Sequence, residues 1–514
     1  MKCSKILVTF LLTLIFSSCT KLDEKFRSEL ERDNNANIKA SDLLISAYSS
    51  LNNLFDGNNN VWSSTTITSD EAIAPTRGRD WYDNGLWQSL HAHTWNADHQ
   101  YLNGGFTGLL AAQFAASNVL EFNPTPQEAA EARFIRALSM FWVLDGYDQV
   151  PYRDDLSDYK KIPTTLKGTE AADFIIAELT AIIGTLPDTG PAYTANKNGA
   201  KALLMKLYLN RGVYANRAAP TFAAADMGKV VTLANEIIAS NKYTLNNTFF
   251  DIFAPDNDAK STESIYTLFN SASANKGGNM RGFAFMVSHY NMNPSGWNGF
   301  STLSDFYDKF QTGDQRRGVY YPYPAGLPNP GHRVNAGFLI GQQYNLTTDA
   351  ALNARTPATA PLVFTREVKI NEPDPNTLEV TGIRVIKYPF DYATPGDQKN
   401  NDYVMFRYAD VLLMKAEALL RTADPAGALT IVNSIRTKRG AANLASADLT
   451  SLLDERGREM YWECWRRQDL IRFGKFLQAW QEKAADAGTK NLLFPIPSSQ
   501  LAVNPNLTQN PGYN

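Results

Sequence analysis

Two pairs of helical segments, separated by a long stretch without helical periodicity, constrain the fold of this 514-residue chain more than any other feature. Apolar residues recur at helical spacing in both pairs, and small residues occupy positions where the helices would cross. Asp424-Pro425 precedes the last segment with a capping carboxylate and a proline at the first helical position. We therefore expect a mainly α-helical chain with tetratricopeptide-like helix pairs, at 201–213 with 230–240 and at 404–420 with 426–437.

The stretch between the two pairs, from about Tyr243 to Gln398, has a different character. It is rich in proline, glycine, asparagine and aromatic residues, and only brief runs such as 362–364 and 383–386 resemble strands. Long loops of this kind pack on a scaffold and commonly carry binding residues. We expect one unit over residues 41–514, composed of an N-terminal helical and ligand-loop part at about 41–242, a loop-rich insertion at about 243–400 and a C-terminal helical part at about 401–514.

The clearest helix of the N-terminal part starts after Thr125. The segment Thr125-Pro126-Gln127-Glu128 supplies a hydroxyl cap, a proline at the first helical position and a glutamate three residues on, which is the capping-box arrangement. Apolar residues then form a wide stripe through Phe134, Leu138 and Phe141. This helix should therefore be buried, and it should end before Val150-Pro151.

The first residues have the pattern of a secretory signal. A basic start precedes an apolar run at residues 6–16 that is too short to span a bilayer, and Ser17-Ser18-Cys19 follows it. Small residues directly before a cysteine resemble the lipobox of bacterial lipoproteins. That likeness implies that residues 1–18 are removed as a signal peptide and that Cys19 becomes an acylated N-terminus, which would anchor the chain stably. Residues 19–40 would then form the lipidated N-terminus and tether.

Charge and cysteine content argue against two further classes of protein. The formal net charge is −3, and removal of Lys2 and Lys5 with the signal leaves −5, so no basic surface for nucleic acid is indicated. Cys3 leaves with the signal and Cys19 is the expected anchor, so Cys464 has no partner for an intramolecular disulfide. The chain is therefore not expected to be a disulfide-stabilised scaffold.

Several segments spread over nearly the whole mature chain resemble the SusD/RagB family of outer-membrane nutrient-uptake lipoproteins. They are 130–137 (AEARFIRA) continuing to Val150-Pro151, 406–418 (FRYADVLLMKAEA), 455–459 (ERGRE), 465–475 (WRRQDLIRFGK), 494–497 (FPIP) and 504–513 (NPNLTQNPGY). The resemblance implies a SusD-like fold in which a loop-rich lobe carries the ligand. It also implies a lipid-anchored position on the outer membrane, exposed at the cell surface, and a SusC-like, TonB-dependent β-barrel transporter as partner.

Tryptophans gather in an otherwise polar, weakly periodic segment of the N-terminal part, where four of the nine lie between Trp62 and Trp95. Sugar rings present an apolar C–H face edged by hydroxyls, so a sugar-binding protein needs flat aromatic side chains beside fixed polar groups. Arg77 can donate through a planar fork, and Asp70 and Asn96 can accept hydrogen bonds. By the family resemblance, the ligand-binding positions are Asp70, Arg77, Trp81, Trp95, Asn96 and, in the later loops, Trp297.

The opposing interpretation of this cluster is that the tryptophans only pack beneath loops, because tryptophan is usually well buried. A similar choice arises for the charges that alternate from Glu455 to Arg472. We interpret those charges as a structural network on one helix, with pairs at spacings of three and four, rather than as a catalytic site. His91, His93 and His99 lack a third metal ligand at suitable spacing, so we expect neither a metal nor a cofactor.

Two alternatives stay open at this point. A glycoside hydrolase would need two carboxylates flanking the scissile bond, and no motif selects a pair from the candidates Asp70, Glu71, Asp80, Asp83 and Asp98. A peptide-binding protein of nutrient uptake, as some RagB-like members are, would use charge and backbone donors in place of ring platforms. The sequence favours a protein that captures an oligosaccharide and delivers it to the transporter without catalysis.

Overall fold

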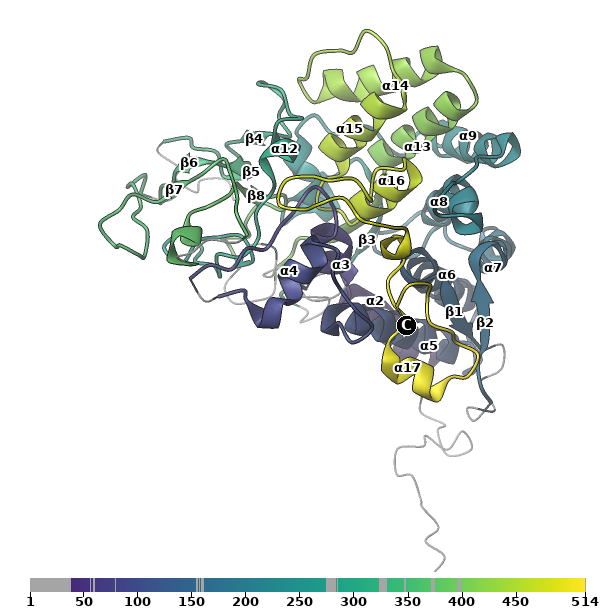
Figure 1. Cartoon of the computed structure of the whole chain (residues 1–514). Helices are drawn as coiled ribbons and strands as arrows, with labels where there is room; N and C mark the ends of the chain where they lie inside the picture. The colour runs from purple at the N-terminus through teal and green to yellow at the C-terminus, as the bar shows by residue number, and fades with distance from the viewer. Residues whose placement is uncertain are drawn as a thin grey trace, which may run out of the picture. The chain divides into compact units, whose positions relative to one another are not determined.

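The computed structural model describes residues 38–513, with gaps at 56, 59–60, 79, 154–155, 157, 159–160, 274–282, 284, 323–330, 346–347, 371–374 and 395–398. The expected signal peptide, Cys19 and most of the tether lie outside the described residues. Residues 40–514 form one compact unit. Figure 1 shows the long helices of this unit on one side and a loop-rich region with short strands on the other.

Helices dominate the described part, as the sequence predicts. They are α2 (Ala40–Asn52), α3 (Val61–Ile67), α4 (Leu86–His91), α5 (Gln100–Val119), α6 (Pro126–Tyr147), α7 (Gly168–Ile182), α8 (Lys197–Ala215), α9 (Ala224–Ala239), α10 (Asn257–Lys260), α12 (Ser304–Tyr307), α13 (Tyr408–Arg421), α14 (Pro425–Lys438), α15 (Leu449–Met460), α16 (Arg466–Arg472) and α17 (Ser498–Val503). Short 3-10 turns are η2 (Asp83–Gly85), η3 (Phe249–Phe253), η4 (Pro375–Glu379) and η5 (Lys490–Leu492).

The strands are all short. They are β1 (Gln149–Tyr152), β2 (Thr164–Lys167), β3 (Ser264–Leu268), β4 (Gly318–Val319), β5 (Ala336–Leu339), β6 (Gly341–Gln342), β7 (Val363–Phe364), β8 (Arg384–Ile386) and β9 (Tyr403–Arg407). Every ladder among them is antiparallel, and the ladders are β1-β2, β3-β9, β4-β5-β8 and β6-β7. The two strand-like runs expected in the loop-rich stretch correspond to β7 and β8. The three-stranded sheet therefore lies within that stretch.

The two expected helix pairs are confirmed, and they are joined in space. Helix α8 packs on α9, α13 packs on α14, and α13 also contacts α9. The long insertion between the pairs therefore leaves and returns without interrupting a continuous helical scaffold. Asp424 caps α14 as predicted, because its carboxylate accepts a hydrogen bond from the backbone N–H of Gly427.

The sequence analysis expected a helical segment at 404–420, and the start of that segment was wrong. Residues 403–407 form β9, which pairs with β3 in the register Val404 to Thr267, and α13 begins only at Tyr408. Each residue of β9 is buried, so the run has no polar face that would distinguish a strand from a helix by periodicity. Its conformation is decided by β3, a segment far earlier in the chain.

Helix α6 is the buried helix that its sequence predicts. The hydroxyl of Thr125 accepts a hydrogen bond from the N–H of Glu128, whose side chain accepts one from the N–H of Thr125. Phe134, Leu138 and Phe141 are fully buried, and Trp142 stacks on Trp465 with ring centroids 4.9 Å apart. The helix therefore joins the N-terminal and C-terminal halves in one core.

The C-terminal charges are structural, but they do not lie on one helix as expected. Helix α15 ends at Met460 and α16 begins at Arg466, with the backbone of Trp462 and Cys464 in the left-handed region between them. Spacings of three do produce the pairs Arg458–Glu455 and Arg472–Asp469. Most partners come from elsewhere in the chain, however, so the network links distant elements. None of the helices in the described part is long and apolar enough to cross a membrane.

Candidate functional site

Arg77 is a buried anchor in the structure. Its guanidinium is 0% exposed and donates to the carbonyls of Gly299, at 2.8 Å, and Thr381, at 2.7 Å, as well as to the hydroxyl of Ser301. Burial lowers the pKa of Arg77 to about 9. These contacts fix the N-terminal tryptophan segment to the loops at 299–301 and 378–381. In this conformation the guanidinium has no exposed surface with which to contact a ligand.

Trp81 lies beneath the loop that carries Trp297. It is 9% exposed, and its indole N–H donates to the carbonyl of Trp297 at 2.7 Å. The backbone of Trp81 has φ 66°, an uncommon conformation for so large a side chain. A Cβ atom on Gly299 would lie 2.4 Å from the Trp81 ring, so a glycine is required at that position for the two segments to approach each other.

Trp297 is the predicted site residue with the greatest exposure of its ring. The residue is 39% exposed, and its ring centroid lies 6.5 Å from that of Trp81 and 5.7 Å from that of Phe285. The loop conformation is supported by hydrogen bonds from the N–H of Trp297 to the carbonyl of Phe285 and from Asn298 to Ser288. The structure thus brings Arg77, Trp81 and Trp297 together as one layered arrangement, with Trp297 on its outside.

Polar and aromatic groups that the sequence analysis did not select as a site lie next to this loop. The hydroxyl of Tyr290 donates to the carboxylate of Asp80, and the guanidinium of Arg355 lies 3.8 Å above the Tyr290 ring and 3.6 Å from the same carboxylate. Burial and the bond to Asp80 raise the pKa of Tyr290, so its hydroxyl stays a donor. We call Asp80, Tyr290, Trp297 and Arg355 the Trp297 surface. It combines two aromatic rings with a charged pair that is about half exposed.

Sequence signals for this surface were uneven. Tyr290 precedes Trp297 by seven residues in the same stretch of asparagine, proline, serine and glycine, so a search for aromatic residues near Trp297 could have found it. Arg355 has no local signal, because only the folding of two loops brings it to Tyr290. The hydrogen bond from the Asn291 amide to the carbonyl of Asn353, at 2.8 Å, holds those loops together.

The other predicted site residues lie in different surroundings. Asp70 forms a two-point ion pair with Arg466, at 2.6 and 2.7 Å, and so ties the N-terminal segment to α16. Trp95 is 2% exposed, donates to the hydroxyl of Tyr513 at 2.6 Å and packs against Phe494. Asn96 is exposed, and its side chain accepts from the N–H of Asp98 in a local turn. A ligand-binding role for these three residues stays a prediction.

Each histidine of the N-terminal segment has its own structural partners. His91 lies between the carbonyls of Ala72 and Gln481, and burial lowers the pKa of its ring to about 4. His93 contacts the carboxylate of Asp486 at 2.8 Å. His99 caps α5 through the N–H of Leu102. Within the described residues the three rings therefore have separate contacts, and the expectation that they bind no metal stays a prediction.

Comparisons with known proteins agree with the fold. Residues 252–513 match the SusD family. The starch-binding protein SusD of Bacteroides thetaiotaomicron is 26% identical over 425 residues, which cover 76% of this chain and 73% of that protein.

Solved structures extend the likeness over nearly the whole chain. Surface glycan-binding protein A of Bacteroides thetaiotaomicron, solved in complex with laminarihexaose, has a TM-score of 0.69 at 18% identity, covering 92% of this chain and 98% of that one. A laminarin-binding SusD-like protein has the same TM-score at 20% identity and covers 92% and 99% of the two chains. The resemblance seen in the sequence is thereby confirmed, and the chain belongs to the SusD family, with its mainly α-helical fold.

Proposed function

We propose that this chain is a lipid-anchored protein of the outer-membrane surface that binds an oligosaccharide and delivers it to a SusC-like, TonB-dependent transporter. Family membership supports the binding role, because relatives bear names for starch binding and laminarin binding. Cys19 would carry the anchor and residues 20–40 the tether, with the body of the protein at 41–514. The three-part division of that body, at about 242 and 400, is retained as part of this proposal.

The Trp297 surface is the observation that supports glycan binding most directly. An indole ring that is 39% exposed can stack on the C–H face of a sugar, while the carboxylate of Asp80 and the guanidinium of Arg355 can bond to hydroxyls at the ring edge. Tyr82, which follows Trp81, adds a ring that is 57% exposed. The Trp297 ring packs against Trp81 and Phe285, so little ordering of this ring would accompany binding.

The roles of the six predicted residues differ within this proposal. Trp297 would contact the sugar. Arg77 and Trp81 would position the loop from below, and their substitution would act through that loop. Asp70, Trp95 and Asn96 would have at most a supporting role in the described conformation, because the first two are engaged by Arg466 and Tyr513.

Binding without catalysis is the second part of the proposal. Of the candidate carboxylates, Asp70 is paired with Arg466, Asp83 accepts from the Trp87 indole at 2.6 Å, and Glu71 is fully buried. Asp80 is the carboxylate on the Trp297 surface, and Tyr290 and Arg355 already engage it. Recovery of the oligosaccharide with unchanged length after incubation would support this part, and shortened products would contradict it.

Calorimetric titration of the chain lacking residues 1–19 tests the proposal. The panel contains α-1,4-linked and β-1,3-linked glucose oligomers, chosen from the ligands that the relatives' names indicate, together with plant and host oligosaccharides and mixed peptides. We expect Trp297→Ala to lower affinity for the bound sugar about 10- to 100-fold, within the range of aromatic hot spots. Its urea midpoint should stay close to wild type, because the ring is partly exposed.

Phe114→Ala is the matched control, since Phe114 is an exposed ring on α5 at 53% exposure. It should leave sugar affinity unchanged. Binding of peptides in place of sugars would favour peptide uptake, and unchanged sugar affinity in Trp297→Ala would reject the Trp297 surface as the site. Copurification of a β-barrel with the native lipoprotein, and loss of acylation in Cys19→Ala, test the partner and the anchor separately.

A further inference from the structure

Glu379 is a buried carboxylate that contacts two loops of the Trp297 surface. It ends the 3-10 turn η4 and is 3% exposed. Its Oε1 atom accepts from the backbone N–H of Arg355 at 2.6 Å and from Nε2 of His289 at 2.7 Å. Its Oε2 atom accepts from the N–H of Thr356 at 3.1 Å. One side chain therefore joins the loop that ends at Thr356 to the loop that contains His289.

The backbone of Glu379 holds a third segment, which carries Trp297. The carbonyl of Glu379 accepts from the side-chain amide of Asn298 at 2.8 Å. Asn298 directly follows Trp297 and has φ 52°, a left-handed conformation that asparagine adopts more readily than most residues. Three members of the Trp297 surface are therefore tied to one residue: Arg355 through its own N–H, and Tyr290 and Trp297 through the residue next to each of them.

His289 makes one of these links, and its hydrogen bonds define where its ring proton lies. The Nδ1 atom accepts from the N–H of Asn291 at 3.1 Å, so the proton of the neutral ring is on Nε2 and is donated to Glu379. Burial lowers the pKa of His289, and the hydrogen bond to Glu379 only partly offsets that effect. The ring is therefore neutral at pH 7 and bonds to the loop on one side and to the carboxylate on the other.

Glu379 also supplies negative charge near two buried guanidinium groups. Arg77 and Arg384 donate to backbone carbonyls of the loops beneath the Trp297 surface. Burial lowers the pKa of Arg77, and interactions with Tyr290 and Glu379 oppose that effect. The substitution Glu379→Gln therefore removes a charge as well as one of two acceptor oxygens.

We propose that Glu379 is the positioning residue of the Trp297 surface. It sets where the Trp297 ring, the Tyr290 ring and the Arg355 guanidinium lie relative to one another, so that a sugar can contact them together. Groups that contact a ligand need hydrogen bonds of this kind behind them to keep a productive geometry. The role rests on the proposed binding of an oligosaccharide at this surface.

Hydrogen exchange without any ligand tests the links themselves. In the chain lacking residues 1–19, Glu379→Gln should speed exchange at 288–291 and at 353–356, because an amide has one acceptor oxygen where the carboxylate has two. Unchanged exchange in both loops would overturn the proposal, whether or not a sugar binds.

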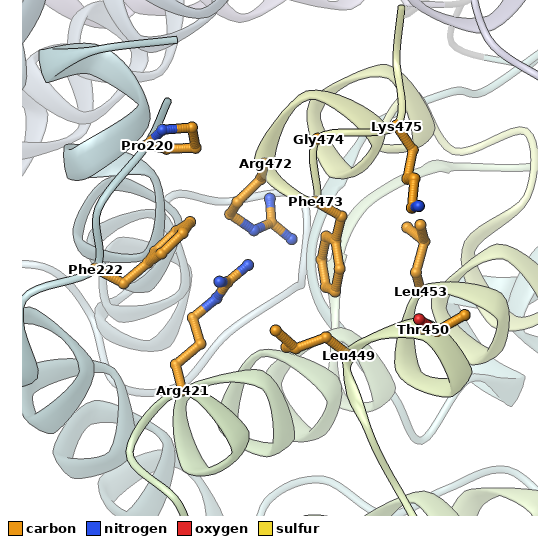
Figure 2. A pocket seen from close by; sticks show the side chains of 10 residues that line it. All are labelled: Pro220, Phe222, Arg421, Leu449, Thr450, Leu453, Arg472, Phe473, Gly474 and Lys475. Carbon is orange, nitrogen blue, oxygen red and sulfur yellow. The ribbon is translucent and has the colours of Figure 1, made fainter. Parts of the chain in front are cut away.

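Glu417→Gln is the matched control. Glu417 is also buried, but it lies on α13, where it pairs with Arg421 and Arg472. Figure 2 shows these two arginines at a hollow of the helical scaffold. The control should lower the urea midpoint, because it removes a buried carboxylate from its cations, and it should leave exchange at the two loops and sugar affinity unchanged.

Calorimetry then tests whether the links position the surface for a sugar. We expect Glu379→Gln to lower affinity for the bound oligosaccharide about tenfold, but less than about twofold when Trp297 is already alanine, because the effects of coupled residues are not additive. Equal fold-losses in the two backgrounds would show a merely structural residue and overturn the proposal. Wild-type affinity in Glu379→Gln, with loss in Trp297→Ala, would overturn it and leave glycan binding standing. Absence of sugar binding by the wild-type chain would reject the proposed function, and this role with it.

Two substitutions of His289 test the same link without changing Glu379, and they decide the matter if Glu379→Gln does not fold. His289→Gln places an amide donor near the position of Nε2, whereas His289→Asn is one methylene shorter and does not reach the carboxylate. We expect sugar affinity about fivefold lower in His289→Asn than in His289→Gln, since only the first leaves Glu379 without this donor. Equal affinities in the two variants would overturn the link through His289.

Discussion

In the helical body, the buried Arg407 and Arg439 pair with the carboxylate of Glu459, as does Arg316, which reaches it from the loop-rich insertion. Beneath the Trp297 surface, the equally buried Arg77 and Arg384 donate instead to backbone carbonyls and neutral side chains. Neither Arg77 nor Arg384 has an ion pair with a carboxylate within the described residues. The two regions therefore satisfy the same side chain by different means.

The difference follows from the backbone around each guanidinium group, which for Arg384 of β8 is the loop at 379–382 and for Arg316 is helix α15. Helices and strands use up their own carbonyls, so a buried guanidinium among them needs carboxylates. Irregular loops leave carbonyls unpaired, and an arginine that donates to several of them both satisfies the loops and fixes their relative positions. In this molecule the arginines that donate to loop carbonyls lie beneath the Trp297 surface and support it. The exposed rings and charges of that surface stay available to a ligand.

The largest effect is expected in the helical body. Burial alone would raise the pKa of Glu459. The guanidinium groups of Arg439, Arg407 and Arg316 outweigh burial and hold this pKa well below its usual value. Glu459→Gln would leave these three cations without their shared carboxylate, so the free energy of unfolding should fall by about 3–5 kcal/mol in urea titrations. Asp308→Asn, which removes an exposed partner of Arg366, should cost less than about 1 kcal/mol. Similar losses of unfolding free energy in Glu459→Gln and Asp308→Asn would show that the buried ion pairs contribute no more to stability than an exposed one.

A slightly smaller effect is expected beneath the Trp297 surface. Arg77→Met removes the donor shared by the carbonyls of Gly299 and Thr381, and leaving these acceptors buried should cost about 3 kcal/mol of stability. Arg355→Met removes an exposed arginine and should cost less than about 1 kcal/mol while it lowers sugar affinity. Urea denaturation and calorimetry on both variants separate the positioning role from the contact role. If Arg355→Met destabilised the fold and Arg77→Met lowered only sugar affinity, Arg355 would be the positioning residue and Arg77 the ligand contact.

The smallest of the three effects depends on pH. Burial lowers the folded-state pKa of His91 to about 4, below the value of about 6.5 for an exposed imidazole. Between these values the unfolded chain binds more protons, so the stability contributed by the neutral ring is present above pH 6.5 and is lost as pH falls toward 4. His91 should account for about 2 kcal/mol of lost stability between pH 7 and pH 5. His91→Gln should reduce that loss, and an unchanged pH profile would show that the ring can charge in place.

Prediction from the sequence was most successful where the signal is local. The capping box at Thr125 and Glu128, the proline at 425 and the periodic apolar stripe of α6 depend on residues a few positions apart, and all were recovered. The start of α13 was misplaced because β9 depends on β3. The C-terminal charges were recognised as structural, but their partners Arg316, Arg407 and Arg439 come from other elements and could not be identified from spacing.

The sequence by itself determined the family, the mainly helical class and the concentration of aromatic and polar residues that a ligand site requires. Each of these depends only on composition, periodicity or short segments of the chain. Only the tertiary structure decided which of those residues face outward. Trp81, Trp95 and Trp297 are the same residue type in similar polar surroundings of sequence, yet the first two are buried and the third is exposed. Exposure depends on which loops cover a side chain, and those loops are brought together by contacts between residues more than two hundred positions apart.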